Sequence, residues 1–263
     1  MPGKMIKKIS DEGFVPPLRR RLNWYWSRLR VNNRNIGWII ETFGNRVFLD
    51  GLRYSVDCPL ISTGHKSTIL FGLHEIEERE LAKAWISPDI PVVEFGGGLG
   101  AVSCLINSRL SKGLPHIVVE ANPAMIPVLK RNKMLNGCDF HLLNNALGYD
   151  EDYIQLNIDK EFVGSSALNT ANSETVKVKT TTLNSLLKEA GLSQVQVICD
   201  IEGLERDLIR REILDNERVV ALLVEMHPRI LGVSEVETLI EELENSGLCL
   251  TQTIGDVSFF KRK

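Results

Sequence analysis

The stretch 91-PVVEFGGGLG-100 decides the expected fold of this chain. The apolar run 90–95 is typical of a buried strand, and a glycine-rich turn follows it directly. A turn of this kind lets the backbone approach a nucleotide-like ligand closely. Gly96, Gly98 and Ala101 loosely satisfy the dinucleotide pattern G-x-G-x-x-G/A, which is weak evidence alone because such turns are common.

Short apolar runs alternate with helical patterns from residue 90 onward. This alternation predicts an α/β fold with mostly parallel strands, right-handed crossovers and helices on both faces of the sheet. The chain closes with a predicted β-hairpin around Gly255-Asp256. The predicted strands are 90–95, 116–120, 140–146, 195–200 and 218–227. Three of the predicted helices are 100–110, 181–191 and 202–214. A fourth is capped by Asn122, has Pro123 as its first residue and stops at Gly137. A fifth begins at a capping box of Ser234 and Glu237 and ends at Gly247.

A basic N-terminal segment precedes this alternating region. Residues 1–34 contain nine Lys/Arg and two Asp/Glu, whereas the whole chain has a net charge of −3. Residues 16–30 favour a helix that packs on the body with its arginines solvated, and contact with a membrane surface or an anionic partner is the weaker alternative. Asp50-Gly51 then predicts a hairpin. We therefore divide the chain into an arm-and-hairpin extension, 1–70, and a main domain, 71–263, which opens with a helix over 73–86.

Composition excludes several classes of protein. The chain has 263 residues, of which 43% are hydrophobic and 25% charged, as in ordinary globular proteins. It contains no apolar run long enough for a transmembrane helix and no secretory signal. The five cysteines form no CxxC pair, which indicates reduced thiols and no zinc site. We expect a cytoplasmic protein with a small-molecule or glycan partner and no nucleic-acid partner.

Two carboxylates indicate which nucleotide-like ligand the turn binds. Glu94 precedes the first glycine by two residues, where it would repel a diphosphate and attract the cationic methionyl end of S-adenosylmethionine (AdoMet). A cap or solvent-facing residue in a phosphate-binding turn is the alternative. Glu120 ends the second predicted strand, and an acid there can accept both ribose hydroxyls of an adenosine. Its alternative role is to stabilise a helix N-terminus.

The end of the third predicted strand is where an adenine edge would lie. Asn145 can read that edge, although a loop-capping role is equally consistent with the residue type. The candidate cofactor-binding residues from this reasoning are Glu94, Gly96, Gly98, Gly100, Glu120, Asn122, Asn145 and Ala146.

Several motifs, in this order, resemble the FkbM-type methyltransferases over roughly residues 70–227. LHE (73–75) is similar to the family's short aromatic-Glu element, which places Glu75 among the candidates. The resemblance implies a class I methyltransferase (Rossmann-like) fold with strand order 3-2-1-4-5-7-6, AdoMet as donor, and a hydroxyl on a sugar-like or natural-product acceptor. The remaining motifs are EFGGGLGAVS, VVEANP, the N-x-x-x-N-G of 132–137, NNALG (144–148), GSSAL (164–168), VKTTTLNSLL (178–187) and CDIEGLE (199–205).

Three positions depart from the family pattern. Ile198 stands where the family usually has a lysine, two residues before the aspartate that Asp200 matches. Glu94 replaces the usual aspartate, and His74 replaces the usual tyrosine.

Methyl transfer to an alcohol requires a group that accepts a proton. We place the candidates at the ends of the fourth and fifth predicted strands, as Asp200, Glu202 and His227, with Glu202 as the preferred base and His227 as its rival. Glu205 and Glu225 lie in the same two segments. Two acids and one histidine at loose spacing are weak evidence for a metal, so we predict no metal site.

Two other functions remain open from the sequence. An NAD-dependent oxidoreductase or epimerase is one, but no tyrosine has a lysine four residues on. The other is a non-catalytic AdoMet-binding module, which the replacement of the family lysine by Ile198 suggests.

Overall fold

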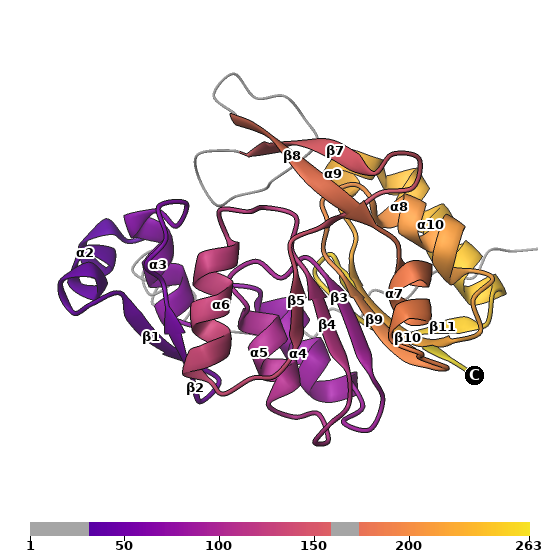
Figure 1. Ribbon diagram of the computed structural model, residues 1–263, viewed down its shortest axis with the longest axis horizontal. Helices are drawn as coiled ribbons and strands as arrows, with labels where there is room; N and C mark the ends of the chain where they lie inside the picture. The colour runs from indigo at the N-terminus through magenta and orange to yellow at the C-terminus, as the bar shows by residue number, and fades with distance from the viewer. Residues whose placement is uncertain (1–31, 159–173) are drawn as a thin grey trace, which may run out of the picture.

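A computed structural model describes residues 32–158 and 174–263 of the chain (Figure 1). The predicted helix over 16–30 and the GSSAL motif lie outside the described residues. No helix in the described ranges combines the length and the apolarity needed to cross a lipid bilayer.

A seven-stranded sheet forms the centre of the molecule, in the order β11-β12-β10-β9-β3-β4-β5. This is the predicted order 3-2-1-4-5-7-6 read from the other edge, which confirms the class I methyltransferase topology. β12 runs antiparallel to both β10 and β11, and the other neighbours are parallel. The strands are β3 (Val92–Phe95), β4 (His116–Val119), β5 (His141–Leu143), β9 (Val195–Cys199), β10 (Val219–Glu225), β11 (Leu248–Ile254) and β12 (Val257–Arg262).

Helices cover both faces of this sheet because its central strands are buried on both sides. One face packs on α4 (Ile76–Trp85), α5 (Ala101–Asn107) and α6 (Ile126–Leu135) through two apolar clusters. The opposite face packs on α7 (Leu183–Glu189), α8 (Glu205–Leu208), the π-helical turn η1 (Ile209–Ile213) and α10 (Val233–Asn245). The short helix α9 (Pro228–Leu231) connects β10 to α10.

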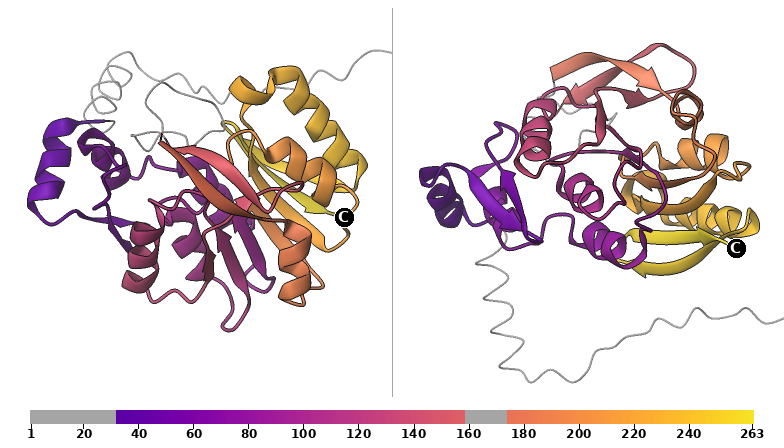
Figure 2. Two further views of the ribbon diagram at one scale, coloured as in Figure 1. Left: turned by 45° about the horizontal axis from the view of Figure 1, so that its top comes forward. Right: turned by 60° about the horizontal axis from the view of Figure 1, so that its bottom comes forward.

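The N-terminal elements lie beside α6, as both turned views show (Figure 2). They are α2 (Arg34–Thr42), β1 (Arg46–Leu49), β2 (Leu52–Ser55) and α3 (Thr63–Leu70). The predicted hairpin turn is present, since Asp50 and Gly51 both have positive φ and connect paired strands. Ile40 and Tyr54 share a buried cluster with residues of α5 and α6, so the extension packs on the main body. The domain boundary at residue 70 stays a prediction.

A small second sheet was not predicted from the sequence. It has the order β6-β8-β7 and comprises β6 (Ala146–Leu147), β7 (Tyr153–Ile158) and β8 (Glu174–Thr181). In Figure 1, β7 and β8 cross over the end of the central sheet. Their position matters for function because residues of β6 and β7 line the pocket described below.

Two predicted helix caps are wrong. α6 begins at Ile126, three residues later than expected, because the Asn122 side chain accepts a hydrogen bond from the backbone of Ala124 in a turn before the helix. α10 has Gly232 as its N-cap, so the proposed capping box does not form; α9 already supplies the preceding turn. In both cases a polar residue of the right type lies near the helix start but outside the capping position.

Candidate functional site

A pocket of about 320 Å³ opens where β3, β4 and β9 end. Ligands of open α/β sheets bind at this edge. The pocket joins the glycine turn, the segment after β4, the segment after β9 and the small second sheet. Its lining residues are His65, His74, Glu75, Phe95, Gly96, Gly98, Val119, Glu120, Ala121, Met125, Asn145, Ala146, Leu147, Ile154, Gln155, Leu156, Asp200, Ile201, Glu202 and Leu204.

The glycine turn brings backbone to the pocket wall, although its glycines have different roles. Gly96 and Gly98 line the pocket, and both have positive φ. A Cβ on Gly96 would lie 2.0 Å from the backbone oxygen of Asp200, so only glycine fits between the ends of β3 and β9. Gly100 does not line the pocket. A Cβ there would lie 2.5 Å from Leu129, so Gly100 allows α5 to pack closely on α6.

Glu120 is held rigidly at the rim of the glycine turn. Its Oε2 accepts a hydrogen bond from the backbone of Gly98 at 2.7 Å, and its Oε1 accepts one from the backbone of Asn122 at 2.6 Å. Burial raises the pKa of Glu120, and these backbone N–H groups oppose that shift. A carboxylate oxygen can accept more than one hydrogen bond, so both oxygens can still accept ribose hydroxyls.

Only some of the other residues predicted to contact the adenosine line the pocket. Asn145 and Ala146 line the pocket, and the Asn145 amide donates to the backbone oxygen of Thr180. Asn122 does not line the pocket; it acts through its backbone, which holds Glu120. Ile154 and Leu156 add an apolar wall from β7 that sequence analysis missed.

Glu94 is not beside the ligand pocket, contrary to the expectation from its place before the glycines. It is 1% exposed, and its carboxylate accepts a hydrogen bond from Ser103 at 2.6 Å and lies 3.1 Å from Nε2 of His116. Burial raises the pKa of Glu94, while His116 and Ser103 oppose the shift. The side chain points into the interior because strand residues alternate between the two faces of the sheet.

The same arrangement explains why Ile198 can replace the family lysine. Ile198 is the register partner of Glu94 on the neighbouring strand, and it is buried in the apolar cluster under α4. A lysine at this position would therefore lie next to the Glu94 carboxylate and outside the pocket. In this chain His116 instead provides the nitrogen atom next to the Glu94 carboxylate. The replacement of the family lysine by Ile198 therefore changes a contact in the interior and not the lining of the pocket.

Replacing Glu94 with glutamine should leave AdoMet affinity within about threefold of the wild type, since the residue does not reach the pocket. The free energy of unfolding should fall by about 1–3 kcal/mol, because a buried charged acceptor for Ser103 and His116 is lost. Calorimetry and denaturant unfolding measure the two quantities. A tenfold or larger loss of AdoMet affinity in the folded variant would show that Glu94 contributes to AdoMet binding.

Three acidic residues lie close to one another in the pocket. Asp200, Glu202 and Glu75 all line it. Burial and the nearby Glu75 carboxylate raise the pKa of Asp200 to about 8, although His227 acts in the opposite direction. Glu202 has a φ of 44°, a left-handed conformation that is uncommon for a non-glycine residue and is often found at functional sites. Glu75 has a similar φ of 48° at the start of α4.

His227 lies beside this acidic group and is oriented by a buried carboxylate. Its Nδ1 is 2.8 Å from Oε1 of Glu205, which is fully buried and also accepts a hydrogen bond from the backbone of Gly203. Burial opposes the charge of His227, but Glu205, Asp200 and Glu225 outweigh it and raise its pKa to about 9. His227 is therefore charged near neutral pH. This weakens its case as a general base.

Two further acids lie in this region; Glu225 was a candidate at the end of the fifth predicted strand, without an assigned role, and Glu78 was not predicted. Glu225 ends β10 and lies 3.8 Å from Nε2 of His227. Glu78 is one helical turn after Glu75 on α4, and its carboxyl group faces that of Glu225. The three-residue spacing from Glu75 was the available signal for Glu78, because residues at i and i+3 share a helix face. Sequence alone does not show that α4 packs against β10.

The features of the pocket fit AdoMet. Gly96 and Gly98 leave room for its methionyl end, Glu120 is placed for the ribose, and Ala146, Ile154 and Leu156 form an apolar slot of the kind an adenine ring needs. The sequence argument for AdoMet survives with one change: the negative charge available to the cationic end comes from Glu75, whose pKa His74 lowers against the effect of burial, rather than from Glu94.

Comparison with known proteins agrees with this architecture. The profile of the methyltransferase FkbM domain matches residues 101–247. No curated protein sequence matches the chain.

Solved methyltransferase structures resemble the chain at low identity. An O-methyltransferase from Bacillus cereus in complex with SAH has 13% identity and a TM-score of 0.41, covering 70% of this chain and 79% of the other. An O-methyltransferase involved in tomaymycin synthesis from Streptomyces achromogenes, in complex with SAM, has 14% identity and a TM-score of 0.41, and the match covers 71% of this chain and 78% of the other. Precorrin-6y C5,15-methyltransferase from Geobacter metallireducens has 11% identity and a TM-score of 0.42, and the match covers 71% of this chain and 85% of the other. These similarities are too low to indicate an acceptor.

Proposed function

Because this chain belongs to the FkbM methyltransferase family and is an AdoMet-dependent methyltransferase, we propose that it methylates a hydroxyl oxygen of a sugar-like or natural-product acceptor. The observation that carries the proposal is the group of acidic residues Asp200, Glu202 and Glu75, which line the pocket together. A hydroxyl must lose its proton as the methyl group arrives, and carboxylates next to the transfer point can receive it.

Binding of the donor is assigned to the glycine turn and Glu120. When bound, AdoMet supplies an electrophilic methyl group on its sulfonium. Glu120 accepts hydrogen bonds from the two ribose hydroxyls. The backbone of Gly98 and Asn122 already fixes its side chain, so little conformational freedom is lost on binding. The glycines bring backbone close to the methionyl end. We place the Glu75 carboxylate near the cationic groups, whose charge it offsets.

We assign to Glu202 the role of receiving the proton of the acceptor hydroxyl. Its carboxylate belongs to the pocket lining two residues after Asp200, on a turn with unusual backbone geometry. His227 is the poorer base because Glu205 keeps it charged near neutral pH. In the proposed step the acceptor oxygen attacks the methyl carbon, the sulfonium C–S bond breaks, and the hydroxyl proton passes to Glu202.

Family membership favours methyl transfer over both alternatives that the sequence left open. We expect the protein to bind AdoMet and its demethylated product and not NAD, since Glu120 is suited to a ribose whereas Glu75 would repel a pyrophosphate. Isothermal titration calorimetry with the three ligands measures this. Binding of NAD in the absence of AdoMet binding would contradict the assignment.

The acceptor can be sought with methyl-labelled AdoMet. The purified protein is incubated with the labelled donor and small-molecule extracts of its native host, and labelled products are located by mass spectrometry. We expect the label as a methyl ether. The Glu120→Ala variant is the matched control, because it should fail to label at the same donor concentration. Label on nitrogen or carbon would contradict O-methylation while leaving methyl transfer intact.

A further inference from the structure

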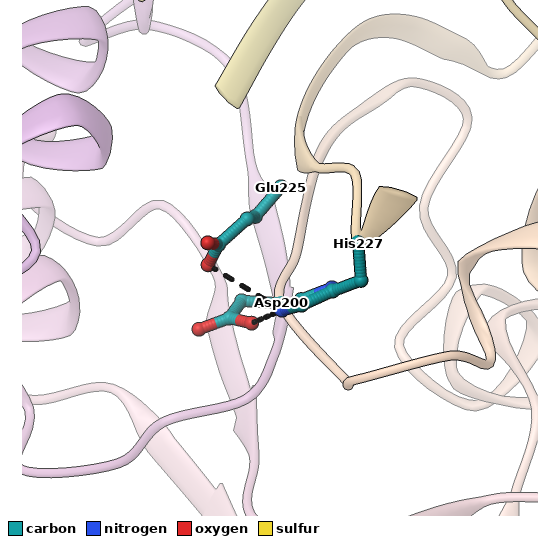
Figure 3. A group of neighbouring side chains, drawn as sticks. All are labelled: Asp200, Glu225 and His227. Carbon is teal, nitrogen blue, oxygen red and sulfur yellow. Dashed lines mark ion pairs between the residues drawn. The ribbon is translucent and has the colours of Figure 1, made fainter. Parts of the chain in front are cut away.

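Three side chains from neighbouring strand ends point toward one centre (Figure 3). Asp200 follows β9, Glu225 ends β10, and His227 comes two residues later. Nε2 of His227 lies 3.7 Å from Oδ1 of Asp200 and 3.8 Å from Oε2 of Glu225. One donor atom from each residue lies within 4.8 Å of the other two. These separations are too long for hydrogen bonds. Donors about 2.1 Å from one tetrahedral ion are about 3.4 Å apart, so a small inward movement of the side chains would bring them to ligand distance.

The histidine is oriented as a metal ligand usually is. Its Nδ1 is bonded to Glu205, and this directs Nε2 toward Asp200 and Glu225. Ligating histidines commonly use the second ring nitrogen in this way, because a carboxylate there fixes the ring and makes the ligating nitrogen more basic. Glu205 is fully buried, so the orientation is built into the core beneath the site.

A fourth carboxylate has a buried oxygen that nothing in the described ranges satisfies. Glu78 is 6% exposed, and its Oε2 has no hydrogen-bond partner among the described residues. Its carboxyl group faces that of Glu225. Burying an unsatisfied carboxylate oxygen is costly. A cation between these groups would offset that cost for Glu78 and for its neighbours together.

We propose that the chain binds one divalent metal ion through Asp200, Glu225 and His227, with Glu78 beside the ion. Binding releases to solvent the proton that Nε2 of His227 carries near neutral pH. Two carboxylates and an imidazole suit first-row ions such as Mn²⁺, Fe²⁺ and Zn²⁺ better than they suit Mg²⁺. Three protein donors leave coordination positions for water or for an acceptor oxygen. The sequence predicted no metal because Asp200, Glu202 and His227 were considered together; the fold brings in Glu225 instead of Glu202.

Mn²⁺ is the probe that tests this site. The full chain is stripped with chelator, and binding is followed by loss of the free-ion signal in electron paramagnetic resonance. We expect one Mn²⁺ per chain, and a 10–100-fold or greater loss of affinity in Glu225→Gln and in His227→Gln. Glu77→Gln is the matched control, since it changes an acid of the same helix as Glu78, and its affinity should equal that of the wild type. Thermal melting without metal identifies variants that do not fold.

Two outcomes would overturn the proposal. One is the absence of any Mn²⁺ binding to the wild type up to about 1 mM; the three side chains would then be a metal-free ion-pair cluster around charged His227. The other is binding that the two folded variants retain at wild-type strength, which would locate the ion elsewhere. Neither donor nor acceptor is present in the titration. Its failure would therefore leave the proposed methyl transfer untouched, and a failure of methyl transfer would leave the metal site standing.

Discussion

Replacing Glu202 with glutamine should lower kcat by about 10²–10⁴-fold, the usual contribution of a general base. The dissociation constant of AdoMet should change little, since glutamine keeps the shape of the side chain and donor binding is assigned to Glu120 and the glycine turn. Pre-steady-state methyl transfer with a saturating donor and a single acceptor separates these quantities. The acidic limb of the pH–rate profile should also disappear in the variant.

His227 and a surface acid provide the comparisons for Glu202. Glu189→Gln changes an exposed acid of α7 far from the pocket and should retain wild-type kcat. His227→Asn should retain the acidic limb of the profile, because the charged histidine does not receive the proton. A near-native kcat in Glu202→Gln, together with loss of that limb in His227→Asn, would transfer the role of base to the histidine.

Replacing Glu120 with alanine should weaken AdoMet binding roughly ten- to hundredfold or more. A charged acceptor for two hydroxyls is lost, and hydrogen bonds to charged groups contribute about 1.5–3 kcal/mol each. The substitution also removes the acceptor that holds the backbone of Gly98 and Asn122, so the glycine turn loses part of its support. Calorimetric titration of the folded variant measures the loss.

Glu94→Gln is the control for Glu120, because it changes another buried acid within the same strand–turn region without touching the pocket. We expect opposite patterns in the two variants. The Glu120 variant should lose donor affinity, and the Glu94 variant should lose mainly stability. Unchanged affinity in folded Glu120→Ala would mean that another group binds the ribose.

The sequence by itself determined the order of the elements and the ends of the strands. The alternation of apolar runs and helical patterns predicted five strands of the central sheet, the terminal hairpin added two, and the family resemblance supplied their order. The glycine turn and Glu120 were also found, because a strand, a tight turn and the acid that ends the next strand are local features. The small sheet was missed because β7 and β8 are joined through a variable region with no clear pattern.

The tertiary structure alone decided which acids meet in the pocket. Glu94 and Glu120 are both strand acids, yet Glu94 turns into the core toward His116 while Glu120 holds the glycine turn. Glu78 and Glu225 are far apart in sequence and become neighbours because α4 packs against β10. Periodicity along the chain reports which residues are buried, since burial follows from local spacing. Which buried or half-buried groups face one another depends on strand register and helix packing, and these are set by contacts between distant segments.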